Sequence, residues 1–522
     1  MDKYYITTAI VYTSGKPHIG NVYDVVLADC IARYKRECGY DVFFMTGTDE
    51  HGQKIELKAK EKNITPKEYV DNIAMQVKNI YDMLNTSYDR FIRTTDEDHV
   101  KACQEIFDTL YKKGDIYKDV YEGWYCTPCE SFFTDAQLID NKCPDCGREV
   151  YKSKEEAYFF KMSKYADKLI EYYKQNDFIE PVSRKNEMMN NFLMPGLKDL
   201  CVSRSSFTWG IKVPFDEKHI IYVWLDALIN YITGIGYSPN GSKDLFKKFW
   251  PADLHVIGKD IVRFHTIYWP IMLMALGLPL PKKIFGHPWL LSSDDNSEGI
   301  KMSKSRGNVL YPDDLIRIFG VDGIRFYLLH EMPFDNDGVV NLKLITERFN
   351  SELANVLGNL VSRTIAMINK YFDGILENKN LNLDIDNSFS NDVNVYIKNS
   401  IDNMEKLKIA DAIDSIFDIF KRCNKYIDET EPWVLAKNEN DTNRLKTVLY
   451  NLSLNIVKAG KLLFPYMPET SMRILNMFST NDITFNNLSK YKIMNGIKVT
   501  NDKENLFIRK NYDEVEEYFG KD

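Results

Sequence analysis

Strand-like and helix-like segments alternate at the beginning of the chain, stop, and then resume after a long interruption. Tyr4–Tyr12 and Val42–Thr46 read as buried strands, followed by helical patterns at 21–38 and 64–84. Further strand-like segments are Ile220–Trp224, Leu254–Ile257 and Ile284–Phe285. Strands that alternate with helices form a parallel sheet. The pattern therefore predicts one α/β sheet that is split by an inserted domain.

The interruption carries four of the chain's nine cysteines, in two close pairs. Cys126 and Cys129 form the first pair, and Cys143 and Cys146 form the second. Four thiolates at this spacing complete a tetrahedral zinc site, and without an open coordination position the metal is structural. The odd number of cysteines argues against a fully paired disulfide framework. We expect one structural Zn²⁺ in a zinc knuckle.

Beyond residue 345 apolar residues recur at helical spacing. Examples are Leu353, Leu360, Ile413 and Leu452. This periodicity predicts an all-α helix bundle. The Asn-, Asp- and Lys-rich stretch 376–394 interrupts it, and there we expect a long exposed connection.

Composition places few limits on function. The chain is 44% hydrophobic and 27% charged, as is usual for globular proteins, and its net charge of −8 neither indicates nor excludes nucleic-acid binding. No segment approaches the ~18 uninterrupted apolar residues of a membrane span, and the start lacks a signal-peptide pattern. We expect a cytoplasmic protein that does not bind membranes.

Two short segments suit phosphate chemistry. His18-Ile19-Gly20-Asn21 opens the first helix, whose N-terminal N–H groups favour an anion, and Gly20 permits close approach. Lys301–Ser305 follows the last strand and brings two lysines into a loop, where they can stabilise charge on a transferring phosphate. Each alone also reads as an ordinary capping or solvated turn.

Together these segments resemble the two signatures of class I aminoacyl-tRNA synthetases, and nearly the whole chain resembles the methionyl-tRNA synthetases. The resemblance implies a Rossmann-type nucleotide-binding domain split by a zinc-knuckle insertion and followed by an all-α anticodon-binding bundle. The implied reaction joins L-methionine to tRNA(Met), including the initiator, through methionyl-adenylate, with release of AMP and pyrophosphate. Mg²⁺ would accompany the ATP.

The resemblance assigns catalytic and ATP-binding residues by position. The implied catalytic residues are His18, Asn21, Lys301 and Lys304, and the implied ATP-binding residues are these four with Gly20, Gly258 and Asp260. Bacterial members usually carry histidine where this chain has Asn21, and we expect a retained hydrogen bond there. The acidic loop 292–299 is longer than the usual hairpin of the family.

Four further segments resemble the walls of the methionine site. The implied methionine-binding residues are Ala9, Ile10, Tyr12, Asp49, Trp224, Ala227, Leu228, Tyr231, Ile261, His265 and Trp269. Asp49 would hold the substrate ammonium group, and Leu228 stands where many relatives have proline. Aromatic faces are good partners for the polarizable thioether of methionine.

The resemblance also assigns anticodon readers in the helical region. Asn359, Arg363 and Trp433 would read the CAU anticodon, with one unpaired base stacked on the indole. The alternative for Trp433 is a buried anchor of the bundle. Since the chain stops at Asp522 without the C-terminal barrel that dimerises many relatives, we expect a monomer.

The resemblance implies the following domain boundaries. Residues 1–115 form the first half of the Rossmann catalytic domain, 116–215 the inserted domain with the zinc knuckle, 216–282 the second Rossmann half, 283–345 a stem-contact region with the second signature, 346–475 the anticodon-binding bundle, and 476–522 a C-terminal segment that packs back on the body.

Two rival functions remain. Leucyl, isoleucyl and valyl synthetases usually need a large editing insertion, because one methylene supplies only ~1–3 kcal/mol of discrimination. The insertion at about 115–215 is occupied by the cysteine pairs and leaves little room for editing. The other rival, an inactive paralogue that binds RNA, commonly loses a signature lysine or the pocket aspartate, and this chain keeps both.

Overall fold

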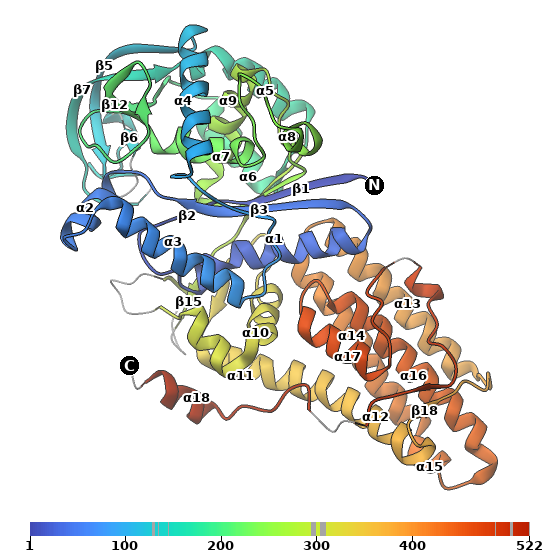
Figure 1. Ribbon diagram of the computed structural model, residues 1–522. Coiled ribbons are helices and arrows are strands. Elements are labelled where there is room, and N and C mark those ends of the chain that lie inside the picture. The colour runs from blue at the N-terminus through green and yellow to red at the C-terminus, as the bar shows by residue number, and fades with distance from the viewer. Residues whose placement is uncertain are drawn as a thin grey trace. The chain divides into compact units, whose positions relative to one another are not determined.

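The computed structural model describes residues 1–127, 131–133, 135–144, 146–293, 299–302, 309–485, 487–501 and 505–520 (Figure 1). The chain divides into two compact units. Unit 1 comprises Met1–Pro17, Asp41–Asp82 and Thr86–His287, and unit 2 comprises His18–Tyr40, Met83–Asn85 and Pro288–Asp522. Each unit is described by itself below.

A parallel sheet forms the centre of unit 1. Its strand order is β2 (Val11–Tyr12), β3 (Asp41–Asp49), β1 (Lys3–Thr8), β13 (Leu254–Gly258), β14 (Ile284–His287) and β8 (Ile179–Glu180), with β4 (Arg90–Arg93) paired to β3. The strands pair in parallel throughout this order. The predicted α/β sheet is thus confirmed, with its first and last strands contributed by distant parts of the chain.

Helices cover both faces of this sheet in Figure 1. The helices α4 (Glu97–Lys112) and α7 (Val223–Thr233) lie on one side of β1 and β3, whereas α2 (Gln53–Glu61) and α3 (Pro66–Met83) lie on the other. Covering both faces explains why these strands are buried over most of their length, as in other parallel sheets. The other helices of unit 1 are α5 (Ala166–Gln175), α6 (Val182–Met188), α8 (Asp244–Phe249) and α9 (Trp269–Leu276).

The insertion forms an antiparallel sheet, of which three strands lie between β4 and β8 in sequence and the fourth follows β8. Its order is β6 (Ser131–Phe133), β5 (Ile116–Cys126), β7 (Tyr151–Phe160) and β9 (Leu200–Cys201). The two long strands pair from Ile116 opposite Phe160 to Tyr125 opposite Tyr151. This ladder carries the cysteine-bearing turns at its far end.

The predicted strand Ile220–Trp224 is wrong in its extent and its pairing. The strand there is β12 (Asp216–Ile221), which pairs antiparallel with β10 (Ser203–Arg204) and β11 (Lys212–Val213) rather than joining the parallel sheet. Trp224 lies on α7, which begins at Val223. A short apolar run fits a buried strand and a buried helix equally well.

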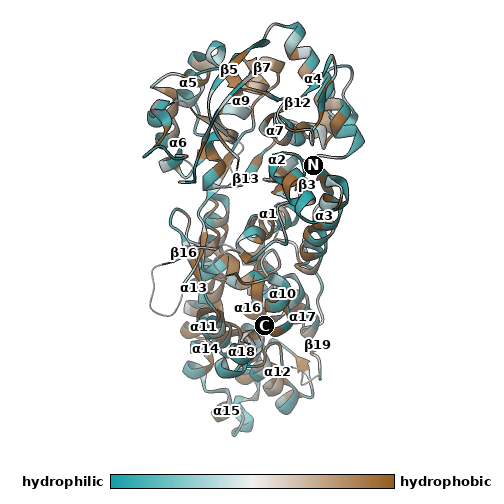
Figure 2. Ribbon diagram, turned by 90° about the vertical axis from the view of Figure 1, so that its left-hand side faces the viewer, coloured by the Kyte–Doolittle hydropathy of each residue, from teal (hydrophilic) through white to brown (hydrophobic). Residues whose placement is uncertain are grey.

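Unit 2 begins with α1 (Ile19–Glu37) and continues with a small sheet of β15 (Leu290–Ser292), β16 (Ile300–Lys301) and β17 (Gly338–Val340). Its further helices are α10 (Pro312–His330), α11 (Leu342–Arg348), α12 (Asn359–Phe372), α13 (Asp384–Glu405), α14 (Ile409–Thr430), α15 (Pro432–Leu435), α16 (Thr442–Leu463), α17 (Pro468–Met477) and α18 (Tyr512–Phe519). In Figure 2 these helices carry both hydrophobic and hydrophilic residues, as expected where one face of each helix packs inward.

The expected exposed connection at 376–394 is wrong for its second half, because α13 begins at Asp384. Phe389, Val393 and Ile397 are buried at intervals of four residues, so this helix packs along one narrow stripe. The polar residues between them conceal that stripe in the sequence.

A buried ion pair fixes α1 within unit 2. The Arg325 guanidinium of α10 lies 2.7 Å from the Asp29 carboxylate of α1, and both side chains are fully buried. Arg325 also donates to the carbonyl oxygens of Leu84, Pro465 and Tyr466. A buried charge is tolerated only when it is paired and hydrogen-bonded, so this network defines how α1 packs.

Among the described residues, no helix is long and apolar enough to cross a membrane.

Candidate active site

Three predicted segments meet at one edge of the parallel sheet. Ala9 and Ile10 follow β1, Asp49 ends β3, and Gly258 ends β13, which is the neighbour of β1 on its other side. The Ala9 N–H donates to the Val256 carbonyl oxygen at 3.0 Å. Ligands of open parallel sheets bind at the carboxyl ends of the strands, where the connections diverge. The β3–β1–β13 edge is such a place.

Backbone contacts fix Asp49 beside the strand that carries Tyr12. Tyr12 pairs with Asp49 in the β2–β3 ladder. The Thr13 N–H and hydroxyl both donate to the Asp49 carbonyl oxygen, at 3.0 and 3.1 Å. The backbones of Asp49 and Tyr12 are thereby held side by side.

Aromatic residues from α7 and from 259–269 face one another in unit 1. The Trp224 indole stacks on the Phe264 ring with centroids 3.6 Å apart and planes 6° apart. The Tyr231 hydroxyl lies 2.7 Å from His265 Nε2, and His265 Nδ1 lies 2.9 Å from the Ile261 carbonyl oxygen. His265 is thus oriented by one residue of α7 and one of its own segment.

The remaining residues predicted for methionine lie deeper. Tyr231 and Trp269 are buried, and their ring centroids are 5.7 Å apart. The Trp269 indole N–H donates to His255 Nε2 at 3.2 Å, and burial lowers the pKa of His255 well below its usual range, which keeps that nitrogen an acceptor. Ala227 and Leu228 are buried on α7 beside them. Among them, Tyr231 contacts both Trp269 and His265.

The first signature is a helix cap in unit 2. His18 is the N-cap of α1, where its Nδ1 accepts from the Gly20 N–H and its own N–H donates to Asn21 Oδ1, both at 3.1 Å. Asn21 thus forms a capping hydrogen bond, which satisfies a free N–H group at the helix start.

The second signature approaches the first within unit 2. A Cβ built on Gly20 would lie 3.0 Å from Met302 Cε, and the Ile19 N–H donates to the Leu310 carbonyl oxygen at 2.9 Å. Lys301 ends β16, whereas Lys304 and residues 294–298 of the acidic loop lie outside the described residues. Asp260 belongs to unit 1, where it follows Gly258 and β13.

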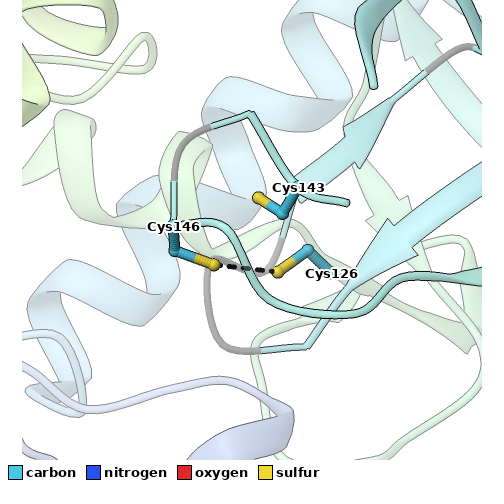
Figure 3. A group of neighbouring side chains, drawn as sticks. All are labelled: Cys126, Cys143 and Cys146. Carbon is cyan, nitrogen blue, oxygen red and sulfur yellow. Dashed lines mark hydrogen bonds between the residues drawn. The ribbon is translucent and has the colours of Figure 1, made fainter. Parts of the chain in front are cut away.

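Three of the four predicted metal ligands converge in the insertion. The Sγ atoms of Cys126, Cys143 and Cys146 all lie within 4.8 Å of one another, and Cys126 and Cys146 are 3.6 Å apart (Figure 3). Tetrahedral zinc with Zn–S bonds of about 2.3 Å separates its sulfur ligands by roughly 3.8 Å. The cluster therefore fits a metal ion bound by thiolates. Cys129 lies outside the described residues.

The predicted anticodon residues gather on the surface of the helix bundle. Asn359 and Arg363 are exposed one turn apart on α12, and Arg363 lies 3.9 Å from Asp428 near the end of α14. Trp433 follows on α15 and is 40% exposed. The alternative prediction, that Trp433 is a buried anchor of the bundle, is therefore wrong. The exposed part of the indole is accessible for stacking.

Family models match most of the chain. The model for tRNA synthetases class I (M) matches residues 4–155 and 147–365, and that for the anticodon binding domain of methionyl tRNA ligase matches residues 380–521. The chain belongs to the methionyl-tRNA synthetase family. This membership confirms the predicted resemblance and fold class.

Individual relatives of the family are similar over nearly the whole chain. The methionine–tRNA ligase of Clostridium acetobutylicum is 59% identical over 491 residues, which are 94% of this chain and 75% of that protein. The one of Clostridium perfringens is 58% identical over 490 residues, 94% of this chain and 75% of its own. A structure of Mycobacterium tuberculosis methionyl-tRNA synthetase in complex with methionyl-adenylate has a TM-score of 0.92 and 39% identity, covering 98% of this chain and all of that one.

Two features of this region were not predicted from the sequence. Phe264, which stacks on Trp224, stands directly before His265, and that adjacency was the only available signal. A buried hydrogen-bonded chain of His51, Asp226 and His99 is the second feature. These residues are far apart in sequence, so no local pattern could have shown their contact.

Proposed function

We propose that the chain joins L-methionine to tRNA(Met) at the expense of ATP, through methionyl-adenylate and with release of AMP and pyrophosphate. The proposal is supported by relatives named methionine–tRNA ligase at 58–59% identity and by the similar Mycobacterium tuberculosis structure, which is a complex with methionyl-adenylate. As an enzyme that uses ATP and tRNA, it would act in the cytoplasm.

The observation that carries the proposal is the packing of Met302 against Gly20. It brings the loop that bears Lys301 to the N-terminal end of α1, where helix N–H groups favour phosphate. Positive charge from Lys301 and Lys304 would then stabilise the α-phosphate as its bonds change. No side-chain nucleophile is needed, because the methionine carboxylate itself attacks that phosphate.

Positioning would supply most of the catalysis. Asp49 would hold the ammonium group, with the side chain of methionine against Trp224 and His265, and Asp260 would hold the ATP ribose. Asp49 ends β3 and Asp260 follows β13, so both belong to the carboxyl edge of the sheet in unit 1. Mg²⁺, when bound with ATP, would neutralise phosphate charge.

The cysteine cluster would hold one zinc ion with a structural role. Cys126, Cys143 and Cys146, together with Cys129, would provide four thiolate ligands and leave no position for a substrate. The ion would fix the turns at the end of the β5–β7 ladder.

An aminoacylation assay tests the function. The enzyme should charge a tRNA(Met) transcript with methionine and fail with leucine, isoleucine or valine. A transcript whose CAU anticodon is changed should be charged far less efficiently, through a higher KM for tRNA. Charging that is independent of the anticodon would reject the role proposed for Asn359, Arg363 and Trp433, and no charging with methionine would reject the function.

A further inference from the structure

A hydrogen-bonded chain of two histidines and one aspartate joins three segments of unit 1. Asp226 Oδ2 lies 2.7 Å from Nδ1 of His51, which follows β3, and Asp226 Oδ1 lies 2.7 Å from Nε2 of His99 on α4. Asp226 itself stands on α7. His99 Nδ1 in turn lies 2.7 Å from the Thr233 hydroxyl at the end of α7. Both oxygens of the carboxylate are therefore used.

The three side chains of this hydrogen-bonded chain are buried. Asp226 and His99 are fully buried, and His51 is 6% exposed. Burial alone would raise the pKa of Asp226, but the charges and hydrogen bonds of His51 and His99 outweigh it and hold this pKa below its usual range. A buried carboxylate with its hydrogen-bonding partners adds little stability compared with apolar residues of similar size, so the value of this hydrogen-bonded chain lies in geometry.

The segment after β3 is anchored on its other side as well. Glu50 is fully buried and accepts from Arg93 Nε and Nη2 at 2.6 and 2.8 Å. The Trp209 indole N–H donates to the Glu50 carbonyl oxygen at 2.6 Å. Glu50 thus ties the segment to β4 and Trp209, whereas His51 ties it to α7.

The two ends of the His51–Asp226 bond stand next to groups of the proposed methionine site. His51 is two residues after Asp49, and Asp226 is two residues after Trp224. Two residues of a helix span only about 3 Å, so a shift of Asp226 moves the start of α7 with it. The bond therefore sets how the segment that carries Asp49 lies against the helix that carries Trp224.

We propose that His51, Asp226 and His99 are positioning residues for methionine, which hold the ammonium-binding carboxylate of Asp49 at a fixed place relative to the Trp224 wall. This inference rests on the proposed function. The three hydrogen-bonded side chains act through Asp49 and Trp224. Breaking their hydrogen bonds therefore weakens methionine binding and leaves ATP binding nearly unchanged.

Two substitutions at His51 separate the hydrogen bond from the rest of the side chain. In His51→Asn the amide nitrogen can replace Nδ1 as the donor to Asp226, whereas in His51→Gln it lies nearer the Nε2 position and loses that contact. Pyrophosphate exchange should give a KM for methionine that is roughly 10- to 100-fold higher in His51→Gln, with KM for ATP within about twofold. His51→Asn should recover most of the loss. Asp226→Asn should resemble His51→Gln.

His330→Gln is the matched control, because His330 of unit 2 also lies between two carboxylates, those of Glu331 and Asp414. Its KM for methionine should equal that of the wild type. If Asp226→Asn does not fold, the His51 pair alone decides. An unchanged KM for methionine in folded His51→Gln, or equal losses in both His51 variants, would overturn the proposal. Failure of the wild type to exchange would instead reject the proposed function.

Discussion

Gly20 of the first signature packs close to Met302 of the second. A Cβ on Gly20 would lie 3.0 Å from Met302 Cε and 3.2 Å from the His18 ring. We predict that Gly20→Ala lowers the kcat of adenylate formation by roughly 5- to 100-fold, since overpacking typically costs about 1–3 kcal/mol. In the Met302→Ala background, where the neighbour is shorter, Gly20→Ala should lower kcat by a smaller factor than it does in the wild type. A double variant in which the two losses simply add would show that the side chains are not coupled.

The cysteine cluster predicts one zinc per chain, measured by metal analysis of protein purified without chelator. Cys126→Ser should lose the metal and make the 116–160 region sensitive to limited proteolysis before the rest of unit 1 unfolds. Cys201→Ala, in the same sheet but outside the cluster, is the control and should keep its zinc. A wild-type chain without metal would contradict the prediction.

Trp433 should matter for tRNA and little for methionine activation. Stacking of one base is worth roughly 1–3 kcal/mol, so Trp433→Ala should raise the KM for tRNA by about one to two orders of magnitude. Because the indole is 40% exposed, the melting temperature should hardly change. Val434→Ala, at a neighbouring residue that is 45% exposed, should charge tRNA normally. Normal charging by Trp433→Ala would exclude the indole as an anticodon reader.

His330 predicts a pH dependence in unit 2. Burial alone would lower its pKa, but the hydrogen bonds to Asp414 and Glu331 outweigh this and raise the pKa to about 9. Because the folded pKa exceeds the unfolded value of about 6.5, the stabilisation is complete below pH 6.5 and is lost as pH rises through 9. The loss should be on the order of 1–3 kcal/mol, reduced by solvent screening at Asp414.

Urea unfolding of the helical signal at pH 6 and at pH 9.5 tests this dependence. The wild type should be less stable at the higher pH, and His330→Gln should show a smaller difference between the two. An equal pH dependence in both proteins would mean that other groups cause it.

The sequence predicted the sheet and the helix bundle because their buried stripes are regular. It failed where an apolar run is short, as at Trp224, and where polar residues dilute the stripe, as in α13 around Phe389 and Val393. Periodicity reports which face is buried but cannot distinguish a strand from a helix over four or five residues.

The candidate site also contains residues that the sequence could identify and contacts that it could not. Residues in compact motifs, such as His18 and the cysteine pairs, could be identified from spacing and resemblance. The contact between His51 and Asp226 joins residues 175 positions apart, and it depends on how α7 packs beside the end of β3. Such contacts follow from tertiary packing, so they appear only in the structure.

Methionine-dependent exchange of pyrophosphate into ATP, in the absence of tRNA, tests the central claim most directly. We predict rapid exchange with methionine, none with leucine, isoleucine or valine, and less than about a tenth of the wild-type activity in Asp49→Ala, where the ammonium group loses its partner. A wild-type enzyme that does not exchange pyrophosphate with methionine would contradict the account.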